Sequence, residues 1–329
     1  MNIFITGGSG FIGSHLVEFL LKRKIKVYLL VEYNFEKSLG WLNNIKNKNL
    51  KVIFGDIRDP SSFQNYVKEC DIVINLAALI SIPYSYKAPK SYIDTNLLGT
   101  FNLLEAAKKY KIKKFIHTST SEVFGNPAYI PIDENHPLQS SSPYAASKSA
   151  ADQLALSYFY SYNLPLLIVR PFNTFGPRQS LRAVIPTIIL QAMKKNKIQL
   201  GNLSTKRDFT YIDDTVNGFY RSIYCNKKYF GHAFNLGIGR SYSIKQIIKI
   251  VETNLNKKII VAFDKKRVRP SKSEILNLVS NNKKARNILK WQPKYASQKN
   301  FSLAIAKTIK WYASPKNLEN FRYIFDYNV

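Results

Sequence analysis

The 329-residue sequence predicts an α/β protein with a doubly wound parallel sheet and a smaller C-terminal lobe. In its first half, short and nearly continuous apolar segments alternate with stretches whose apolar residues recur at helical spacing. Strands that are apolar throughout are covered on both faces, which is typical of parallel sheets. After about Pro177 the segments become shorter, and loops and turns become more frequent. This change predicts the second, smaller lobe.

The predicted strands and helices follow one another from the first residues onward. Residues 2–6 (NIFIT) form the first strand and residues 12–23 the first helix. The remaining strands are expected at 26–31, 51–55, 71–78, 113–120 and 164–172, and the remaining helices around Ser91–Lys109 and at 143–162. We assign residues 1–177 to the sheet domain, with strands that return from later segments, 178–312 mainly to the smaller lobe, and 313–329 to a tail without an assigned function.

The composition excludes several classes of protein. Hydrophobic residues make up 45% of the chain, enough for a large core, and charged residues make up 21%, unlike a disordered chain. The two cysteines, Cys70 and Cys225, fit no metal-ligand spacing, and the four histidines are scattered, so we expect no metal. No signal peptide precedes the first strand, and no apolar run is long enough to span a bilayer. These features predict a reduced, cytoplasmic protein without membrane contact.

The formal net charge of +28 has two explanations. A basic excess favours binding to the phosphates of nucleic acids. Alternatively, lysine replaces other solvated residues wherever the surface tolerates it. The basic residues are spread along the chain and no nucleic-acid-binding motif accompanies them, so we favour the second explanation and expect no nucleic-acid partner. A positive field would also help to capture an anionic nucleotide.

A glycine-rich turn follows the first predicted strand directly. Gly7, Gly10 and Gly13 stand in the segment GGSGFIG, just before the first helix. Glycines at such a turn let backbone N–H groups approach a pyrophosphate at the helix N-terminus. A tight turn without a ligand is the alternative. The strand–turn–helix context favours a dinucleotide site of the Rossmann type, in which Phe11 and Ile12 also contact the cofactor.

The end of the second predicted strand should carry the residue that contacts the adenosine ribose. Glu32 stands there. Its carboxylate could accept a hydrogen bond from the 2′-hydroxyl of NAD and would repel the 2′-phosphate of NADP. We therefore expect NAD as the cofactor.

Tyr144 and Lys148 lie four residues apart in SPYAASKSA, and therefore on one face of the helix expected at 143–162. A free tyrosine has a pKa of about 10, too high for a base at neutral pH. A neighbouring ammonium group and a positive nicotinamide would favour the phenolate. Tyr144 could then take the proton from a substrate hydroxyl while a hydride leaves the same carbon.

These motifs, together with the segment HTSTSEVFG at 117–125, resemble the NAD-dependent epimerase/dehydratase family of extended short-chain dehydrogenases. The resemblance covers residues 1 to about 312. It implies that Tyr144 and Lys148 are catalytic and also bind the cofactor, that the hydroxyl of Thr120, a further catalytic residue, bonds the sugar O4, and that Glu122 is the catalytic base. The cofactor contacts that it implies are Asp56, Ile57, Leu76, Ala77 and Ala78. The usual acidic position of the family falls on Val31, one residue before Glu32, which leaves NADP as an alternative.

Glu122 favours one reaction of this family over the others. A 4,6-dehydratase oxidises the sugar at C4, which acidifies the C5 hydrogen, and then needs a base to remove the C5 proton and expel the C6 hydroxyl. Simple 4-epimerases usually lack an acid at this position. The alternative is that Glu122 only caps or solvates a loop. Ser121 precedes it, as in GDP-mannose dehydratases and nucleotide-uronate decarboxylases, where dTDP-glucose dehydratases typically have Asp.

Three further segments resemble the family's site for a nucleotide diphosphate, namely RPFNTFGPR at 170–178, KRDFTYIDD at 206–214 and Arg269-Pro270. The resemblance implies substrate contacts by Ser121, Asn173, Arg207 and Arg269, with Asn173 near the phosphates. Planar guanidinium groups suit phosphate oxygens. The segments at 77–86, 117–125 and 170–189 are most similar to the N-acetylglucosamine nucleotide 4,6-dehydratases of legionaminic acid synthesis.

The sequence therefore predicts an NAD-dependent nucleotide-sugar 4,6-dehydratase that converts an NDP-N-acetylhexosamine of the GlcNAc type to its 4-keto-6-deoxy product, for surface glycans or nonulosonic acids. Three alternatives remain: a 4-epimerase, a uronate decarboxylase, and a basic nucleotide-sensing or RNA-binding protein on an inactive dehydrogenase fold. The intact set of Thr120, Tyr144 and Lys148 disfavours the last. The helices near 91–109 and at 143–162 carry apolar residues on more than one face, which predicts a homodimer with a four-helix interface.

Overall fold

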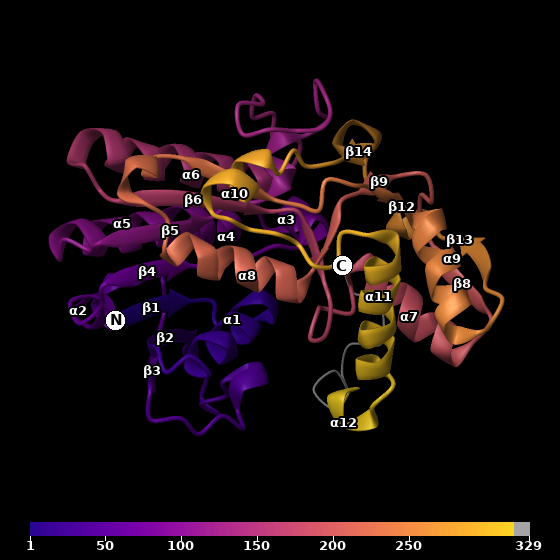
Figure 1. The fold of residues 1–329 in the computed structure, drawn as a ribbon, viewed down its shortest axis with the longest axis horizontal. Coiled ribbons are helices and arrows are strands. Elements are labelled where there is room, and N and C mark those ends of the chain that lie inside the picture. The colour runs from indigo at the N-terminus through magenta and orange to yellow at the C-terminus, as the bar shows by residue number, and fades with distance from the viewer. Residues whose placement is uncertain (319–329) are drawn as a thin grey trace.

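Seven parallel strands form the central sheet of the computed structural model, which describes residues 1–318 (Figure 1). In sheet order they are β11 (Ala233–Leu236), β6 (Leu166–Pro171), β5 (Lys114–Thr118), β4 (Ile72–Asn75), β1 (Asn2–Thr6), β2 (Lys26–Glu32) and β3 (Leu50–Gly55). The chain runs from β1 to one edge and then crosses back through β4 to the other edge. This is the predicted doubly wound sheet. Its strand order reverses between β1 and β4, and such sheets bind ligands in the crevice beyond the carboxyl ends of the strands at that reversal.

Helices cover both faces of the sheet, as its apolar strands require. They are α1 (Phe11–Leu21) and α8 (Ile212–Ile223) on one face, and α2 (Gln64–Val67), α5 (Gly99–Lys109) and α6 (Pro143–Tyr162) on the other. Strand β1 shows the alternation that this arrangement needs, because Ile3 and Ile5 pack with Leu16 of α1, whereas Phe4 packs with Leu103 of α5. The sheet is therefore buried on both sides.

Helix α6 begins and ends where its sequence predicts. The Ser142 hydroxyl accepts a hydrogen bond from the backbone N–H of Ala145 (3.2 Å), and Pro143 occupies the first turn. Asn163 follows the last helical residue in the left-handed conformation (φ 53°). These caps fix the position of the helix that carries Tyr144.

Two predicted elements were wrong in their bounds. The helix expected around Ser91–Lys109 is divided into α4 (Pro89–Tyr92), a π-helical segment (Ile93–Leu98) and α5, and α3 (Ile82–Lys87) precedes them. The strand expected at 71–78 ends at Asn75. The backbone N–H groups of Leu76 and Ala77 donate to the Thr6 hydroxyl (3.1 and 3.0 Å) instead of continuing the ladder, so the chain leaves the sheet there.

The later part of the chain forms a smaller lobe beside the carboxyl ends of the strands (Figure 1). Its strands and those that connect it to the sheet are β7 (Asn173–Phe175), β8 (Lys197–Leu200), β9 (Lys206–Arg207), β10 (Phe209–Tyr211), β12 (Tyr242–Ser243), β13 (Ile260–Phe263) and β14 (Asn277–Leu278). The remaining helices are α7 (Val184–Lys194), α9 (Ile244–Leu255), α10 (Lys283–Ile288), α11 (Gln298–Tyr312) and α12 (Pro315–Leu318). Within residues 1–318, we find no helix with the length and apolarity needed to cross a membrane.

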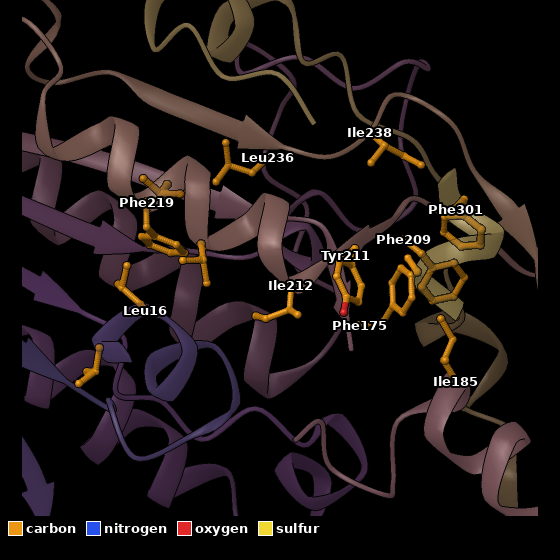
Figure 2. Packing of buried hydrophobic residues seen from close by; sticks show 14 of the residues in the cluster. Leu16, Phe175, Ile185, Phe209, Tyr211, Ile212, Phe219, Leu236, Ile238 and Phe301 are labelled. Carbon is orange, nitrogen blue, oxygen red and sulfur yellow. The ribbon is translucent and has the colours of Figure 1, made fainter. Parts of the chain in front are cut away.

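One aromatic cluster joins the lobe to the sheet (Figure 2). The Phe175 ring lies 5.5 Å from the ring of Tyr211 and 5.2 Å from that of Phe301, between centroids. The same continuous core extends to Leu16 and Phe219 against the sheet. The two parts thus share a core, and the division at residue 177 stays a prediction. Of the predicted tail, residues 319–329 lie outside the described residues.

Candidate active site

The glycine turn after β1 has the geometry of a phosphate cradle. Gly7 has a φ of 66°, and a Cβ atom there would lie 2.6 Å from the backbone nitrogen of Ala77. A Cβ on Gly13 would lie 2.3 Å from the Gly7 carbonyl oxygen, so both positions need glycine for close packing. Gly10 is different, because its Cβ would meet only the Gly7 oxygen, at 3.4 Å. It precedes α1 without a side-chain cap, so the first N–H groups of the helix, from Phe11 onward, are placed to bind an anion.

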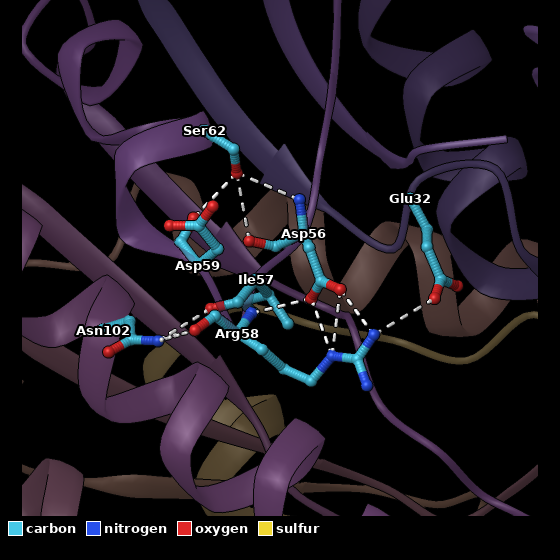
Figure 3. Close-up of polar contacts among 7 residues, drawn as sticks. All are labelled: Glu32, Asp56, Ile57, Arg58, Asp59, Ser62 and Asn102. Atoms are coloured by element: carbon cyan, nitrogen blue, oxygen red, sulfur yellow. Dashed lines mark hydrogen bonds and ion pairs between the residues drawn. The ribbon is translucent and has the colours of Figure 1, made fainter.

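The carboxyl ends of β2 and β3 carry three charged side chains in contact (Figure 3). Arg58 Nε lies 2.9 Å from each carboxylate oxygen of Asp56, and its Nη2 lies 3.9 Å from Glu32 Oε1. The hydrogen bond from Arg58 holds the pKa of Asp56 below its ordinary value. Asn102 of α5 donates to the carbonyls of Ile57 and Arg58 and fixes this loop. The sequence interpretation named Asp56, Ile57 and Glu32 but missed Arg58, which ties the two acids together.

Tyr144 and Thr120 come together from two elements. Thr120 follows β5 and caps the 3₁₀ turn Ser121–Phe124, where its hydroxyl accepts a hydrogen bond from the Glu122 N–H (3.2 Å). The same hydroxyl forms a hydrogen bond with Tyr144 from the first turn of α6. Lys148 lies buried one turn further along α6. The four predicted catalytic residues are therefore gathered at the carboxyl end of β5, and the cap is made by Thr120 rather than by the Glu122 side chain.

That Lys148 and a bound nicotinamide together favour the Tyr144 phenolate stays a prediction. Burial raises the pKa of the Tyr144 phenol, and the hydrogen bond with Thr120 only partly opposes this. Lys148 is itself desolvated, and burial lowers the pKa of its ammonium to about 8 although Asp152 raises it. Further positive charge near Tyr144 is needed to make it a base at neutral pH.

A fully buried carboxylate, Asp152, lies behind this pair. It accepts hydrogen bonds from the hydroxyl of Ser119 (2.7 Å) and from Nε and Nη2 of Arg170 (3.2 and 3.1 Å), and His117 Nε2 lies 3.3 Å away. Burial alone would raise the pKa of Asp152, but Arg170 and His117 outweigh it and bring the pKa to about 2. Sequence reasoning missed Asp152. Its place four residues after Lys148, on the same helix face, was the available signal.

The predicted substrate arginines lie next to Glu122, at the junction with the smaller lobe. Arg269 Nη1 donates to Glu122 Oε2 (3.3 Å), and Arg207 Nη2 lies 3.7 Å from Glu274 Oε1. Glu122 and Arg207 are buried, and Arg269 is partly exposed. The site therefore combines one carboxylate beside Thr120 with two guanidinium groups that can bind phosphate oxygens.

Asn173, which begins β7, carries a buried side-chain oxygen with no hydrogen-bond partner among residues 1–318. Buried polar atoms are normally paired, so such an oxygen is a candidate contact for a ligand. Ser121 and Ala78 follow β5 and β4, at the carboxyl ends of two neighbouring strands of the sheet. In the described part of the chain, histidine, cysteine, aspartate and glutamate side chains form no cluster that could hold a metal ion.

The chain is similar to known proteins along most of its length. The family model described as GDP-mannose 4,6 dehydratase matches residues 4–302. A dTDP-D-glucose 4,6-dehydratase from Homo sapiens is 33% identical over 333 residues, which cover 97% of this chain and 91% of that protein. The particular similarity to the enzymes of legionaminic acid synthesis, and the roles of the individual site residues, stay predictions.

Two solved structures share the fold and represent two reactions. A mutant of the UDP-glucuronic acid 4-epimerase from Bacillus cereus, in complex with NAD and a fluorinated substrate analogue, superposes with a TM-score of 0.86 at 28% identity, over 94% of this chain and 98% of that one. The dTDP-glucose 4,6-dehydratase DesIV from Streptomyces venezuelae, with NAD bound, has a TM-score of 0.84 at 26% identity, over 95% and 97%. The chain therefore belongs to the GDP-mannose 4,6-dehydratase family, a group of extended short-chain dehydrogenases that contains sugar-nucleotide dehydratases and epimerases.

Proposed function

We propose that this protein is an NAD-dependent nucleotide-sugar 4,6-dehydratase. The observation that carries the proposal is the position of Glu122. Its backbone N–H is bonded to the Thr120 hydroxyl, and the charge of its carboxylate contributes to raising the pKa of Tyr144, so the carboxylate lies near the groups that would hold the sugar O4. A base in that place can reach the carbon next to C4. A reaction confined to C4 needs no such base.

The residues around the glycine turn fit NAD. The turn allows the backbone to approach a pyrophosphate, and Glu32 with Asp56 places negative charge where a ribose hydroxyl would bind. Bound NAD would accept a hydride from C4 and return it at C6, and its positive nicotinamide would supply the charge that favours the Tyr144 phenolate. The backbone of Leu76 and Ala77, fixed by Thr6, would border the cofactor.

The side chains divide the reaction into two stages. First, Tyr144 takes the proton of the C4 hydroxyl, which Thr120 orients, as C4 becomes a ketone. The ketone acidifies the C5 hydrogen, and Glu122 removes it as a proton. The C6–O bond then breaks, and Glu122 returns its proton to the leaving hydroxyl, so that one water is lost across C5 and C6. The returned hydride would add at C6, C5 takes a proton from solvent by way of Glu122, and Tyr144 releases the proton of the C4 hydroxyl to solvent, which completes the 4-keto-6-deoxy product.

The proposed substrate is an NDP-N-acetylhexosamine of the GlcNAc type. Arg207 and Arg269 supply guanidinium groups for its diphosphate. The buried side-chain oxygen of Asn173 has no partner among the described residues and can accept a hydrogen bond from the substrate. The preference for an N-acetylated sugar rests on the sequence similarity at 77–86, 117–125 and 170–189. Products of this kind would enter surface glycans or nonulosonic acids.

A 4-epimerase is the second candidate, because an epimerase structure from Bacillus cereus superposes as well as a dehydratase does. The test is to incubate the purified protein with a panel of nucleotide sugars, including nucleotide uronates, and to follow each by mass spectrometry. Loss of one water is expected. Loss of carbon dioxide would indicate a decarboxylase, and a new stereoisomer of unchanged mass an epimerase. Tyr144→Phe is the control for background breakdown.

We also propose a homodimer with a four-helix interface. Ile93, Leu98 and Phe101, from the π-helical segment and α5, are 40–47% exposed, so apolar side chains project from this face. Light scattering at micromolar concentration should give twice the mass of the chain. Leu98→Lys should weaken the dimer at least about tenfold, because a two-fold interface receives the charge twice. Leu303→Lys, at a similarly exposed position on α11, is the control and should leave the dimer intact. A monomeric parent protein would contradict the proposal.

A further inference from the structure

Glu122 and Arg269 belong to distant parts of the sequence but form one ion pair. Glu122 lies in the 3₁₀ turn after β5, and Arg269 lies in the smaller lobe, 147 residues later. Arg269 Nη1 donates to Glu122 Oε2 at 3.3 Å. The Glu122 side chain is 9% exposed and that of Arg269 is 27% exposed, so the pair is shielded from solvent on the carboxylate side and open on the guanidinium side. A ligand could therefore reach the arginine while the carboxylate stays covered.

The neighbouring arginine is held in a different way. Arg207 Nη1 donates to the backbone carbonyls of Ile275 (2.7 Å) and Lys206 (3.0 Å), and its Nη2 faces Glu274. Fixed backbone contacts keep Arg207 in place whether or not it binds a further anion. Arg269, in contrast, is positioned by its ion pair with Glu122. This ion pair joins the turn after β5 to the smaller lobe.

We propose that Arg269 is shared between Glu122 and the diphosphate of the substrate, so that binding of the diphosphate releases the catalytic base. This inference rests on the proposed function, because it takes Arg269 as a diphosphate ligand and Glu122 as the base. A diphosphate carries more negative charge than one carboxylate and offers oxygens that match a guanidinium group. When it takes Arg269, the Glu122 carboxylate is left without its ion pair and is free to contact the C5 hydrogen.

The consequence is that Glu122 opposes nucleotide binding, although it serves the reaction. The protein with bound NAD is titrated calorimetrically with UDP, dTDP and GDP, which lack the sugar and cannot react. Glu122→Gln should bind the preferred diphosphate about three- to tenfold more tightly than the parent, a range reduced because the pair is partly exposed. Arg269→Gln should bind it more weakly. The double variant should bind no more tightly than Arg269→Gln alone, because without Arg269 there is no guanidinium group for which Glu122 and the diphosphate can compete.

Two controls separate this competition from simpler causes. Glu69→Gln removes one negative charge from a distant surface pair with Lys51 and should bind the diphosphate as the parent does. Thermal unfolding of each variant verifies that it is folded. The proposal is overturned if Glu122→Gln binds no more tightly, if its gain persists in the Arg269→Gln background, if Glu69→Gln gives the same gain, or if none of the three diphosphates binds. Failure of the dehydratase function would be seen separately, as no loss of water from any nucleotide sugar with the parent enzyme.

Discussion

Two carboxylates, Asp152 and Glu122, lie near Tyr144, and the protein holds them in opposite ways. Asp152 is completely buried, and Ser119, Arg170 and His117 surround it. Glu122 has one ion pair, with an arginine from a distant loop that is open to solvent on its far side. Both charges are shielded from water, but only one is fixed. Asp152 favours the protonated form of Lys148 throughout the reaction, so its position can be fixed. Glu122, as the proposed base, must accept and return a proton, and therefore needs a partner that it can exchange.

The largest effect on stability is expected from removing the fixed charge of Asp152. Asp152→Asn would leave Arg170 and Lys148 as two buried cations without a compensating anion. We expect the free energy of unfolding to fall by about 3–5 kcal/mol, the usual cost of breaking a buried ion pair. Urea denaturation at neutral pH measures it. Glu122→Gln is the matched variant and should cost less than Asp152→Asn, because the Arg269 that it leaves without a partner is partly exposed to solvent. Equal losses would mean that both carboxylates are structural.

Glu122→Gln should instead affect the chemistry. We expect formation of the 4-keto-6-deoxy product to slow by about 100-fold or more, because the proton at C5 has no base to accept it. In D₂O the parent enzyme should place deuterium at C5 of the product, and the variant should not. Tyr144→Phe should abolish C4 oxidation as well. A Glu122→Gln enzyme that releases product at nearly the parent rate would end the assignment of Glu122 as the base.

The pH dependence tests the link between Asp152 and Lys148. Burial lowers the pKa of Lys148 to about 8, so C4 oxidation should decline as the pH rises through about 8 and the ammonium is lost. In Asp152→Asn, where the pKa of Lys148 loses the contribution that raises it, the decline should begin at a lower pH. Glu122→Gln should leave the pH at which C4 oxidation declines unchanged. Single-turnover rates across the neutral and alkaline range measure it, and a decline at the parent's pH in Asp152→Asn would contradict the link.

The lowered pKa of Lys148 also determines how the stability of the fold changes with pH. The pKa of Lys148 is about 8 in the folded protein, against 10.5 for an ordinary lysine, so the unfolded chain binds more protons between these values. The contribution of Lys148 to the free energy of unfolding should therefore rise with pH across that window.

The smallest effect is expected at the most exposed carboxylate of the site. Glu32, whose side chain is 83% exposed, should make NAD bind more tightly than NADP by repelling a 2′-phosphate. Glu32→Ala should narrow this preference by only a few-fold, because solvent screens the charge. Calorimetry with both cofactors measures it, and Glu36→Ala, at a nearby exposed position, is the control. Equal or tighter binding of NADP by the parent protein would leave Glu32 as a surface residue.

Local signals predicted the parts of the fold that depend on neighbouring residues. The bounds of β1 and α6 follow from the glycine turn and from the Ser142–Pro143 cap, which are contained in short stretches of sequence. The sequence did not predict the π-helical interruption at Ile93–Leu98. It also could not predict that the strand expected at 71–78 would end early, because that end depends on a hydroxyl from β1.

The candidate site divides in the same way. Motif spacing identified Thr120, Tyr144 and Lys148, which the fold gathers at one strand end. The resemblance named Arg269 as a substrate contact, but the sequence did not predict its ion pair with Glu122 or the contact of Arg170 with Asp152. Each of these pairs joins elements that are distant in the sequence. The burial that raises the pKa of Tyr144 was not predicted either, because burial depends on the whole fold.

The position of β11 at the edge of the sheet also determines how this protein can be made. β11 (Ala233–Leu236) pairs with β6, and α8, just before it in the chain, packs against α1. A chain emerging from the ribosome therefore cannot complete its sheet until residue 236 is available, after much of the smaller lobe has been synthesised. A fragment ending at residue 177 would expose the edge of β6 and the apolar face of α1, and unpaired strand edges promote aggregation. The nucleotide-binding half of the molecule is thus not a part that can be expressed alone by cutting the gene at that point.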